Sequence, residues 1–220
     1  PMSFLKKLLA LLAAVLLLCA ACIAAAAWWV SESALNRAYR VESAPLPAPT
    51  RGAVPRGAHL FATRGCSDCH GDAGQGRELL DEAPLYVAGT NLTPAGVGRF
   101  YSPEAMARAI RHGIGFDDRA LIFMPSHDYA EMSDADVVDL IAYLRQLPAA
   151  EDEPAPTRLK PLGRVLYTFG QLPVLAAEHI DHSPRERSAP PVGATVEYGA
   201  YLALTCPGSP GAAYAGQRAP

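Results

Sequence analysis

Residues 64–71 read RGCSDCHG, and this stretch decides how the rest of the chain is interpreted. Cys66 and Cys69 are separated by two residues, and His70 follows directly. Thiols and an imidazole at this spacing can form a disulfide, bind a metal ion or hold a prosthetic group. The surrounding sequence discriminates among these three roles.

The composition is that of a folded protein without a nucleic-acid partner. The chain has 220 residues, of which 50% are hydrophobic, and a formal net charge of −3. This length accommodates one ordinary domain and additional segments. A weakly acidic chain has no field that attracts a polyanion, so we expect no nucleic-acid partner. The cysteines are too few and too unevenly spaced for a disulfide scaffold: Cys19, Cys22, Cys66, Cys69 and Cys206.

An apolar segment near the N-terminus predicts a membrane anchor over residues 1–31. Leu8–Val30 contains no charged residue, and a helix of this length can cross a bilayer core of roughly 30 Å. The segment follows two lysines and closes on two tryptophans, Lys6, Lys7, Trp28 and Trp29. That order favours a helix that begins in the cytoplasm, with the rest of the chain exported. The alternative is a cleaved signal peptide, but the apolar region of a signal peptide is usually shorter, about 7–15 residues.

Proline-rich segments flank the central part of the chain. Residues 32–55 carry a cluster of prolines and predict an extended spacer that holds the following domain away from lipid. Residues 149–194 are again rich in proline and predict a connector. Within it, LGRVLYTFGQLPVLAAEHI predicts a helix or strap packed on the preceding domain. The alternative for this stretch is a membrane-surface helix, which we disfavour because its basic residues form no clear polar face.

The central segment, residues 56–148, contains two well-defined helix signals. In SPEAMARAIRHG, Ser102 can cap a helix and Gly113 can end it. In SDADVVDLIAYLRQLP, Ser133 can cap a second helix whose apolar residues recur at helical spacing until Pro148. Each helix has one apolar face, so we expect both to pack on a shared core.

The remainder of the central segment shows no pattern of regular structure. Residues 71–98 are rich in Gly, Pro, Asn and Thr and predict mostly loop. No run alternates convincingly between apolar and polar residues, so no sheet is expected. The predicted fold class is therefore all-α.

Covalent haem is the role of CSDCH that these surroundings favour. A thiol-disulfide redox motif needs a strand-helix setting that this region does not predict. A structural zinc site needs four ligands, but only Cys66, Cys69 and His70 cluster. Two thiols separated by two residues can instead reach both vinyl groups of haem and place the adjacent imidazole under the iron. We therefore predict one covalent haem c, with iron, on this motif.

A second iron ligand is expected from the methionines and histidines that follow the motif: Met106, His112, Met124, His127 and Met132. Met106 lies on the apolar face of a predicted helix and Met132 adjoins a helix cap, so both favour a packing role. Met124 stands in LIFMPSHDY, where Pro125 discourages helix and leaves a loop that can approach the iron. His127 is flanked by polar residues, so Met124 is the favoured ligand.

A family resemblance supports this assignment. The motifs CSDCHG, GTNLTP, AIRHGIG, FMPSHDY and SDADVVDLIAYLRQLP occur in this order over residues 56–148 and resemble those of a class I cytochrome c domain. They especially resemble the haem domains of membrane-bound cytochrome subunits that serve periplasmic alcohol and sugar dehydrogenases. The resemblance implies an all-α class I cytochrome c bundle around one covalent haem, behind an N-terminal transmembrane helix. It also implies thioethers at Cys66 and Cys69, and iron ligation by His70 and Met124.

The function expected from these features is electron transfer. With both axial positions filled by side chains, the iron has no open site for a substrate, so the chain is predicted to be a carrier and not an enzyme. We expect a tethered cytochrome in the bacterial inner membrane, with its soluble domain in the periplasm. Its expected partners are a dehydrogenase as donor and an oxidase or another cytochrome as acceptor. The alternative is a haem-based sensor or peroxidase in which Met124 dissociates.

The C-terminal segment, residues 195–220, predicts an incomplete second cytochrome c-like domain. EYGAYLALTCPGSPG resembles the stretch that leads into CSDCH, with Cys206 at the first thiol position. Ser209 and Pro210 occupy the second thiol and ligand positions and can neither form a thioether nor ligate iron. We therefore expect a single haem, a free thiol at Cys206 and poor order over residues 195–220. A truncated or shifted reading frame and a decayed domain are both consistent with this pattern.

Overall fold

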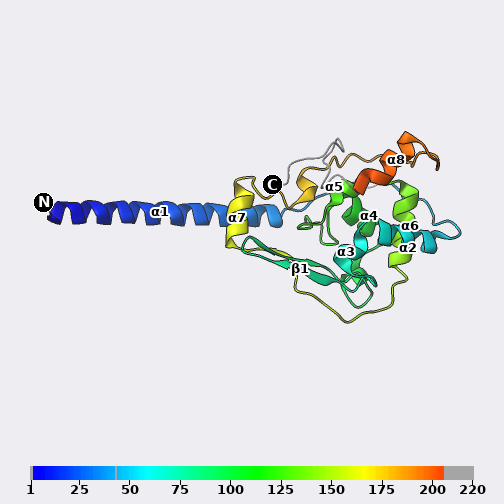
Figure 1. Ribbon diagram of the computed structural model, residues 1–220, viewed down its shortest axis with the longest axis horizontal. Coiled ribbons are helices and arrows are strands. Elements are labelled where there is room, and N and C mark those ends of the chain that lie inside the picture. The colour runs from blue at the N-terminus through cyan, green and yellow to red at the C-terminus, as the bar shows by residue number, and fades with distance from the viewer. Residues whose placement is uncertain (1, 43, 206–220) are drawn as a thin grey trace.

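A long helix leads into the folded domain. The computed structural model describes residues 2–42 and 44–205. Helix α1, Met2–Leu35, projects from the domain as a rod (Figure 1). Its 34 residues, at about 1.5 Å each, give a length of about 50 Å. An 18-residue apolar stretch of α1 has no buried residue and a mean hydropathy of 2.9, which makes α1 a candidate membrane span.

The first core forms where two helices cross. Helix α2, Ala53–Thr63, packs against helix α6, Asp134–Leu144. Gly57 allows the close approach, because a Cβ there would lie 1.9 Å from the carbonyl oxygen of Asp139. One turn further along, the rings of Phe61 and Tyr143 lie 5.5 Å apart. The first core is completed by apolar side chains of these two helices and of residues 103–132: Leu60, Phe61, Met106, Ile110, Tyr129, Met132, Val137, Leu140, Ile141 and Leu144.

The two helix signals in the sequence are confirmed. Helix α4, Pro103–His112, begins after Ser102, whose hydroxyl accepts a hydrogen bond of 3.1 Å from the backbone N–H of Ala105. It ends at Gly113, which has the left-handed φ of 65° that ends many helices. Helix α6 begins in the same way, because Ser133 accepts a hydrogen bond of 3.1 Å from the N–H of Asp136. Helix α5, Ser126–Tyr129, is a single turn between them.

The prediction of an all-α fold without a sheet is wrong. Strands β1, Arg77–Asp81, β2, Leu85–Gly89, and β3, Arg158–Leu159, form an antiparallel sheet in the order β1-β2-β3. All five residues of β2 are buried, so the strand reads as a continuous run and not as an alternation. The third strand comes from the proline-rich connector, and no local pattern reveals this pairing.

A second core lies beside the sheet. It joins the end of α1, the strands, the loop after α4 and the connector, and its main members are Ala34, Leu85, Val87, Ile114, Ala120, Leu159, Val174, Leu175 and Ala177. Leu175 and Ile114 are both fully buried. The connector includes α7, Pro161–Thr168, and the short helix η2, Ala176–Glu178. The predicted packing of the connector on the preceding domain is therefore observed, although α7 itself packs mainly on α1.

The predicted spacer does not hold the domain at a distance. Residues 36–42 and 44–50 lack helix, as expected, but they lie along the domain. The N–H of Tyr39 donates a hydrogen bond of 2.8 Å to the carbonyl of Asp118, and Tyr39 and Val41 pack against the second core. Leu46 packs against the first core. The prolines exclude regular structure here without preventing side-chain packing.

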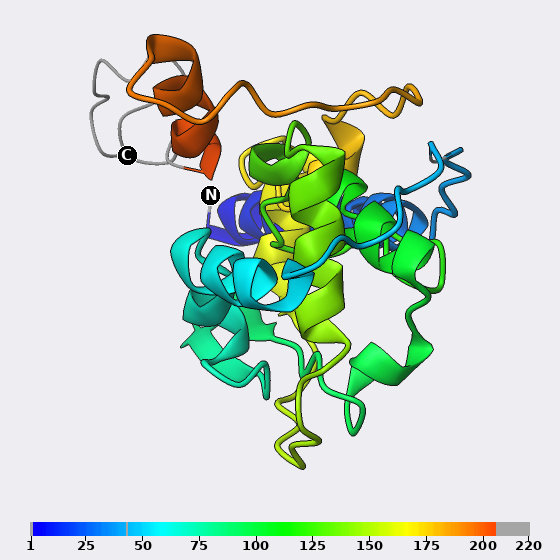
Figure 2. The same ribbon diagram turned by 90° about the vertical axis from the view of Figure 1, so that its right-hand side faces the viewer.

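The described part of the C-terminal segment is helical, contrary to the expectation of poor order. Helix α8, Val196–Leu202, is followed by the short helix η3, Ala203–Thr205. The Tyr201 side chain is buried, and its hydroxyl accepts a hydrogen bond of 3.0 Å from the N–H of Ser133. In Figure 2 the end of the connector runs over the domain to reach α8. Cys206 and the rest of the predicted second haem motif lie outside the described residues.

Candidate haem-binding site

The CSDCH motif forms a helix of its own. Helix α3, Cys66–His70, is enclosed by Gly65 and Gly71, whose φ angles of 79° and 77° let the chain reverse on both sides. Cys66 and Cys69 are half-buried and are not joined in a disulfide. Cys66 packs against the first core. The turn therefore presents both thiols and the following histidine from one compact element.

The His70 ring is held by one hydrogen bond. Its Nδ1 lies 2.8 Å from the carbonyl oxygen of Thr90, so Nδ1–H donates to that carbonyl. Nε2 is then the unprotonated nitrogen, available as a metal ligand. Burial lowers the pKa of His70, which favours the neutral ring that ligation requires. The Thr90 carbonyl thus sets both the orientation and the tautomer of the imidazole.

The sheet brings Thr90 to this position. A Cβ at Gly89, the last residue of β2, would lie 1.9 Å from the carbonyl oxygen of Cys69, so only glycine lets the strand end against α3. The N–H of Gly76 donates a hydrogen bond of 2.7 Å to the carbonyl of His70 and closes the intervening loop. The role of Thr90 was not predicted from the sequence. Gly89, the first residue of GTNLTP, was the only indication in this motif that the backbone here passes close to another element.

A cavity of about 210 Å³ lies beside the first core. Its wall is mainly apolar and includes Leu92, Pro94, Tyr101, Met106 and Leu144. Arg99 and Arg145 also line it, and both are exposed. Two of the apolar residues belong to the GTNLTP motif. The cavity therefore combines an apolar interior with a cationic edge.

Met124 lies in the loop between α4 and α5. Its side chain is half-buried and packs against the first core, as do those of Cys66 and Tyr101. The residue before it, Phe123, has a φ of 70°, which is unusual for a bulky side chain. The N–H of Phe123 donates a hydrogen bond of 2.7 Å to the carbonyl of Val174. The connector therefore braces the loop that carries Met124.

The other candidate ligands occupy different surroundings. Met132 is fully buried within the first core. The His127 side chain is 60% exposed and lies 3.3 Å from a carboxylate oxygen of Asp128. His112 is buried and contacts His182. Met106 is buried in the first core but also lines the cavity, which makes it the strongest rival to Met124.

The alternative roles of the two thiols find little support in this geometry. Burial raises the pKa of the Cys66 thiol to about 12 and also raises the pKa of Cys69. Cysteines of thiol-disulfide enzymes instead have lowered pKa values that favour the thiolate. Within residues 2–42 and 44–205, no three His, Cys, Asp or Glu side chains group as a metal site would require. Attachment to haem remains the role that the residues fit.

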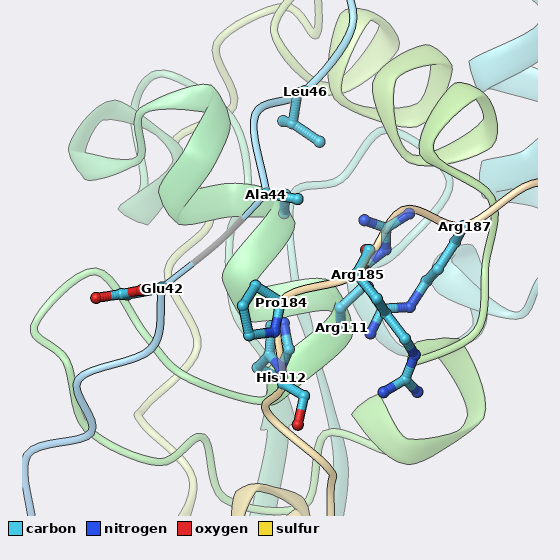
Figure 3. A pocket seen from close by; sticks show the side chains of 10 residues that line it. Glu42, Ala44, Leu46, Arg111, His112, Pro184, Arg185 and Arg187 are labelled. Carbon is cyan, nitrogen blue, oxygen red and sulfur yellow. Dashed lines mark hydrogen bonds between the residues drawn. The ribbon is translucent and has the colours of Figure 1, made fainter.

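A second, smaller hollow lies between α4 and the connector (Figure 3). Its volume is about 20 Å³, enough for a water molecule, and it is lined by Arg111, Arg185 and Arg187 together with His112. Nδ1 of His112 lies 3.0 Å from Nδ1 of His182, whose Nε2 lies 3.0 Å from the carbonyl of Ala177. Burial, and then the neighbouring His182, lower the pKa of His112 to about 4. The hollow is a small polar contact between α4 and the connector, and its lining is mainly charged.

The comparison with protein families defines the class. Residues 52–144 match the family described as cytochrome C oxidase, cbb3-type, subunit III. This match covers α2, α3, most of the cavity wall, Met124 and α6. The chain therefore carries a cytochrome c domain, whose class is that of electron carriers and not of enzymes.

Two curated relatives narrow the comparison. The chain is 31% identical over 180 residues to a subunit of nicotinate dehydrogenase from Pseudomonas putida, an alignment that covers 74% of this chain and 14% of that protein. It is 33% identical over 129 residues to the fructose dehydrogenase cytochrome subunit of Gluconobacter japonicus, with 54% of this chain and 26% of that protein covered. The chain thus spans about a quarter or less of the length of these relatives.

Proposed function

We propose that this chain is a membrane-tethered periplasmic cytochrome that transfers single electrons between a dehydrogenase and a terminal acceptor through one haem. The hydrogen bond from His70 to the Thr90 carbonyl carries the proposal, because it leaves Nε2 free and fixes the ring beside the two thiols. The names of the two relatives support a dehydrogenase as donor. An oxidase or another cytochrome would act as acceptor.

The residues present fit a haem group. Cys66 and Cys69 would form the thioethers, and His70 and Met124 would hold the iron. Arg99 and Arg145 supply positive charge for the two carboxylates of haem. When bound, haem supplies a reversible one-electron change at its iron.

The side chains around the cavity determine what chemistry is allowed. Leu92, Tyr101 and Leu144 exclude water and lower the local dielectric, which favours the less charged, reduced state. If His70 and Met124 both held the iron, no position would remain there for a substrate. The protein groups therefore restrict the site to electron transfer.

One observation favours a second candidate, a sensor or peroxidase with a dissociable Met124. Phe123 has a positive φ, and its side chain is 43% exposed. Backbone strain of this kind occurs at sites that change conformation. In that case the ferric protein would contain a substantial high-spin fraction, whereas a carrier is low-spin in both oxidation states.

Absorption spectra of three variants test the ligands. We expect His70→Ala to abolish stable holoprotein, and Met124→Ala to keep covalent haem but lose the low-spin spectrum and lower the potential. Met106→Leu is the matched control, because it removes the methionine sulfur that lines the cavity while conserving volume. A low-spin spectrum that survives Met124→Ala and is lost in Met106→Leu would transfer the ligand to Met106.

Fractionation of the full chain tests the tether. The apolar span, the two preceding lysines and the two closing tryptophans support an anchor with the domain outside the cytoplasm. We expect the holoprotein in the membrane fraction. Recovery in the soluble fraction with an N-terminus near Trp28 would show a cleaved signal peptide instead.

A further inference from the structure

Helix α7 has an apolar stripe that the described part of the protein leaves largely uncovered. Leu162, Val165, Leu166 and Phe169 recur at helical spacing. Leu162 is 48% exposed and Phe169 is 62% exposed. Large exposed apolar side chains grouped on one helix face indicate a binding surface.

The position of α7 on α1 indicates what covers this stripe. Arg164 donates a hydrogen bond of 2.9 Å to the Ser31 hydroxyl and another of 2.9 Å to a carboxylate oxygen of Glu32. Its guanidinium lies 3.9 Å from the centre of the Trp28 ring. Ala27 and Ser31 are buried under α7. The helix is therefore attached to α1 at the level of its tryptophans, where a membrane helix leaves the hydrocarbon.

The orientation of α7 is also consistent with a position at the membrane surface. In Figure 1, α7 lies across α1 and not along it, so a helix α1 along the membrane normal places α7 in the membrane plane. Arg164 and Thr168 face α1. Gly163 and Tyr167 face the domain, since Gly163 abuts the Pro84 carbonyl and Tyr167 packs on the second core. The apolar stripe faces away from both.

We propose that α7 is an interfacial helix, the alternative that its sequence alone did not favour, and that it rests on the outer surface of the bilayer and fixes the orientation of the cytochrome domain on the membrane. The occupant of the stripe is the lipid interface, because the stripe continues the exposed apolar surface of α1. Trp28 and Trp29, 58% and 72% exposed, join the two surfaces. The inference rests on the proposed membrane tether. It adds a second contact with lipid that limits rotation of the domain about its anchor.

Photo-crosslinking to lipid tests this contact in the full holoprotein. Benzoylphenylalanine is placed singly at Leu162, Phe169, Leu16 or Leu202, and the protein is reconstituted in nanodiscs of phosphatidylcholine and phosphatidylglycerol. Capture of lipid at Leu16 shows whether α1 lies in the bilayer. Leu202 is the matched control, because it is 48% exposed, like Leu162, but lies on α8 far from α1 (Figure 1).

We expect lipid capture at Leu162 and Phe169 to exceed that at Leu202 by about tenfold. Capture at Leu16 with only the Leu202 level at both α7 positions would overturn the inference while leaving the tether intact. Absence of capture at Leu16 would overturn the tether and the inference together. Arg164→Ala, checked for an unchanged haem spectrum, should reduce capture at Phe169 several-fold and leave Leu16 unchanged, and undiminished capture at Phe169 would contradict the role of Arg164 as the attachment.

Discussion

The two hydrophobic cores of this protein are assembled from different kinds of sequence information. The first core is formed by α2, α4 and α6, and the caps and apolar spacing that define α4 and α6 lie within each helix. The second core joins Ala34, Val87, Ile114 and Leu175, which belong to four distant parts of the chain. A cytochrome core can therefore be recognised locally, whereas the layer that links it to the anchor depends on long-range contacts.

The largest loss of stability is expected from a substitution where α2 and α6 cross in the first core. Gly57→Val places a side chain where the backbone of Asp139 already lies 1.9 Å from a Cβ position, so α2 and α6 must separate. We expect a loss of at least about 3 kcal/mol in the free energy of unfolding, measured by chemical denaturation of the holoprotein. Gly199→Ala is the control, since within residues 2–42 and 44–205 no atom beyond its own helix backbone lies within 4 Å of its Cβ position. Equal stability of the two variants would contradict the crossing.

Truncation in both cores tests whether the second is a true core. Leu175 is fully buried in the second core and Leu140 is 2% exposed in the first. We expect Leu175→Ala and Leu140→Ala each to cost about 2–5 kcal/mol on denaturation. Leu175→Ala should in addition disturb the low-spin spectrum, because the adjacent Val174 braces the Met124 loop. A cost below about 1 kcal/mol for Leu175→Ala would show that the second core is only a loosely packed surface contact.

Acid titration tests the contact between His112 of α4 and His182 of the connector. The pKa of His112 is about 4 in the folded protein, below its ordinary value of 6.5. Between these values the unfolded chain binds a proton that the folded protein excludes, so stability is full above about pH 6.5 and falls as the pH drops to about 4. The loss from this group is at most about 3 kcal/mol. His112→Asn keeps a donor toward His182 and should flatten the curve, and an unchanged curve would assign the acid sensitivity elsewhere.

The smallest effect concerns a single helix cap of the first core. Ser102→Ala removes the hydroxyl that accepts from the N–H of Ala105 and should cost about 1 kcal/mol. Ser102→Asp should restore most of this stability, since aspartate is an equally good cap. Thermal unfolding of the three proteins measures the difference. Equal destabilisation by alanine and aspartate would show that the site depends on packing and not on capping.

These contrasts explain how much could be predicted from the sequence. Ser102 and Ser133 signalled α4 and α6 because a cap acts within one turn. Strand β2 was missed because every residue in it is buried, which removes the alternation of apolar and polar residues, and because one of its two partners, β3, lies in the distant connector. The thiols and His70 were recognisable from their spacing, whereas Thr90 acts through a backbone carbonyl, and the preceding Gly89 was only an indirect signal for it. Met106 was assigned to packing alone, although it also lines the cavity.

The intact mass of the recombinant 220-residue chain, matured in a host that attaches haem to exported proteins, tests the central claim most directly. Under denaturing conditions the account predicts the polypeptide mass plus one haem, retained because Cys66 and Cys69 hold it covalently. A mass that lacks haem, or one that contains two haems, would contradict the account.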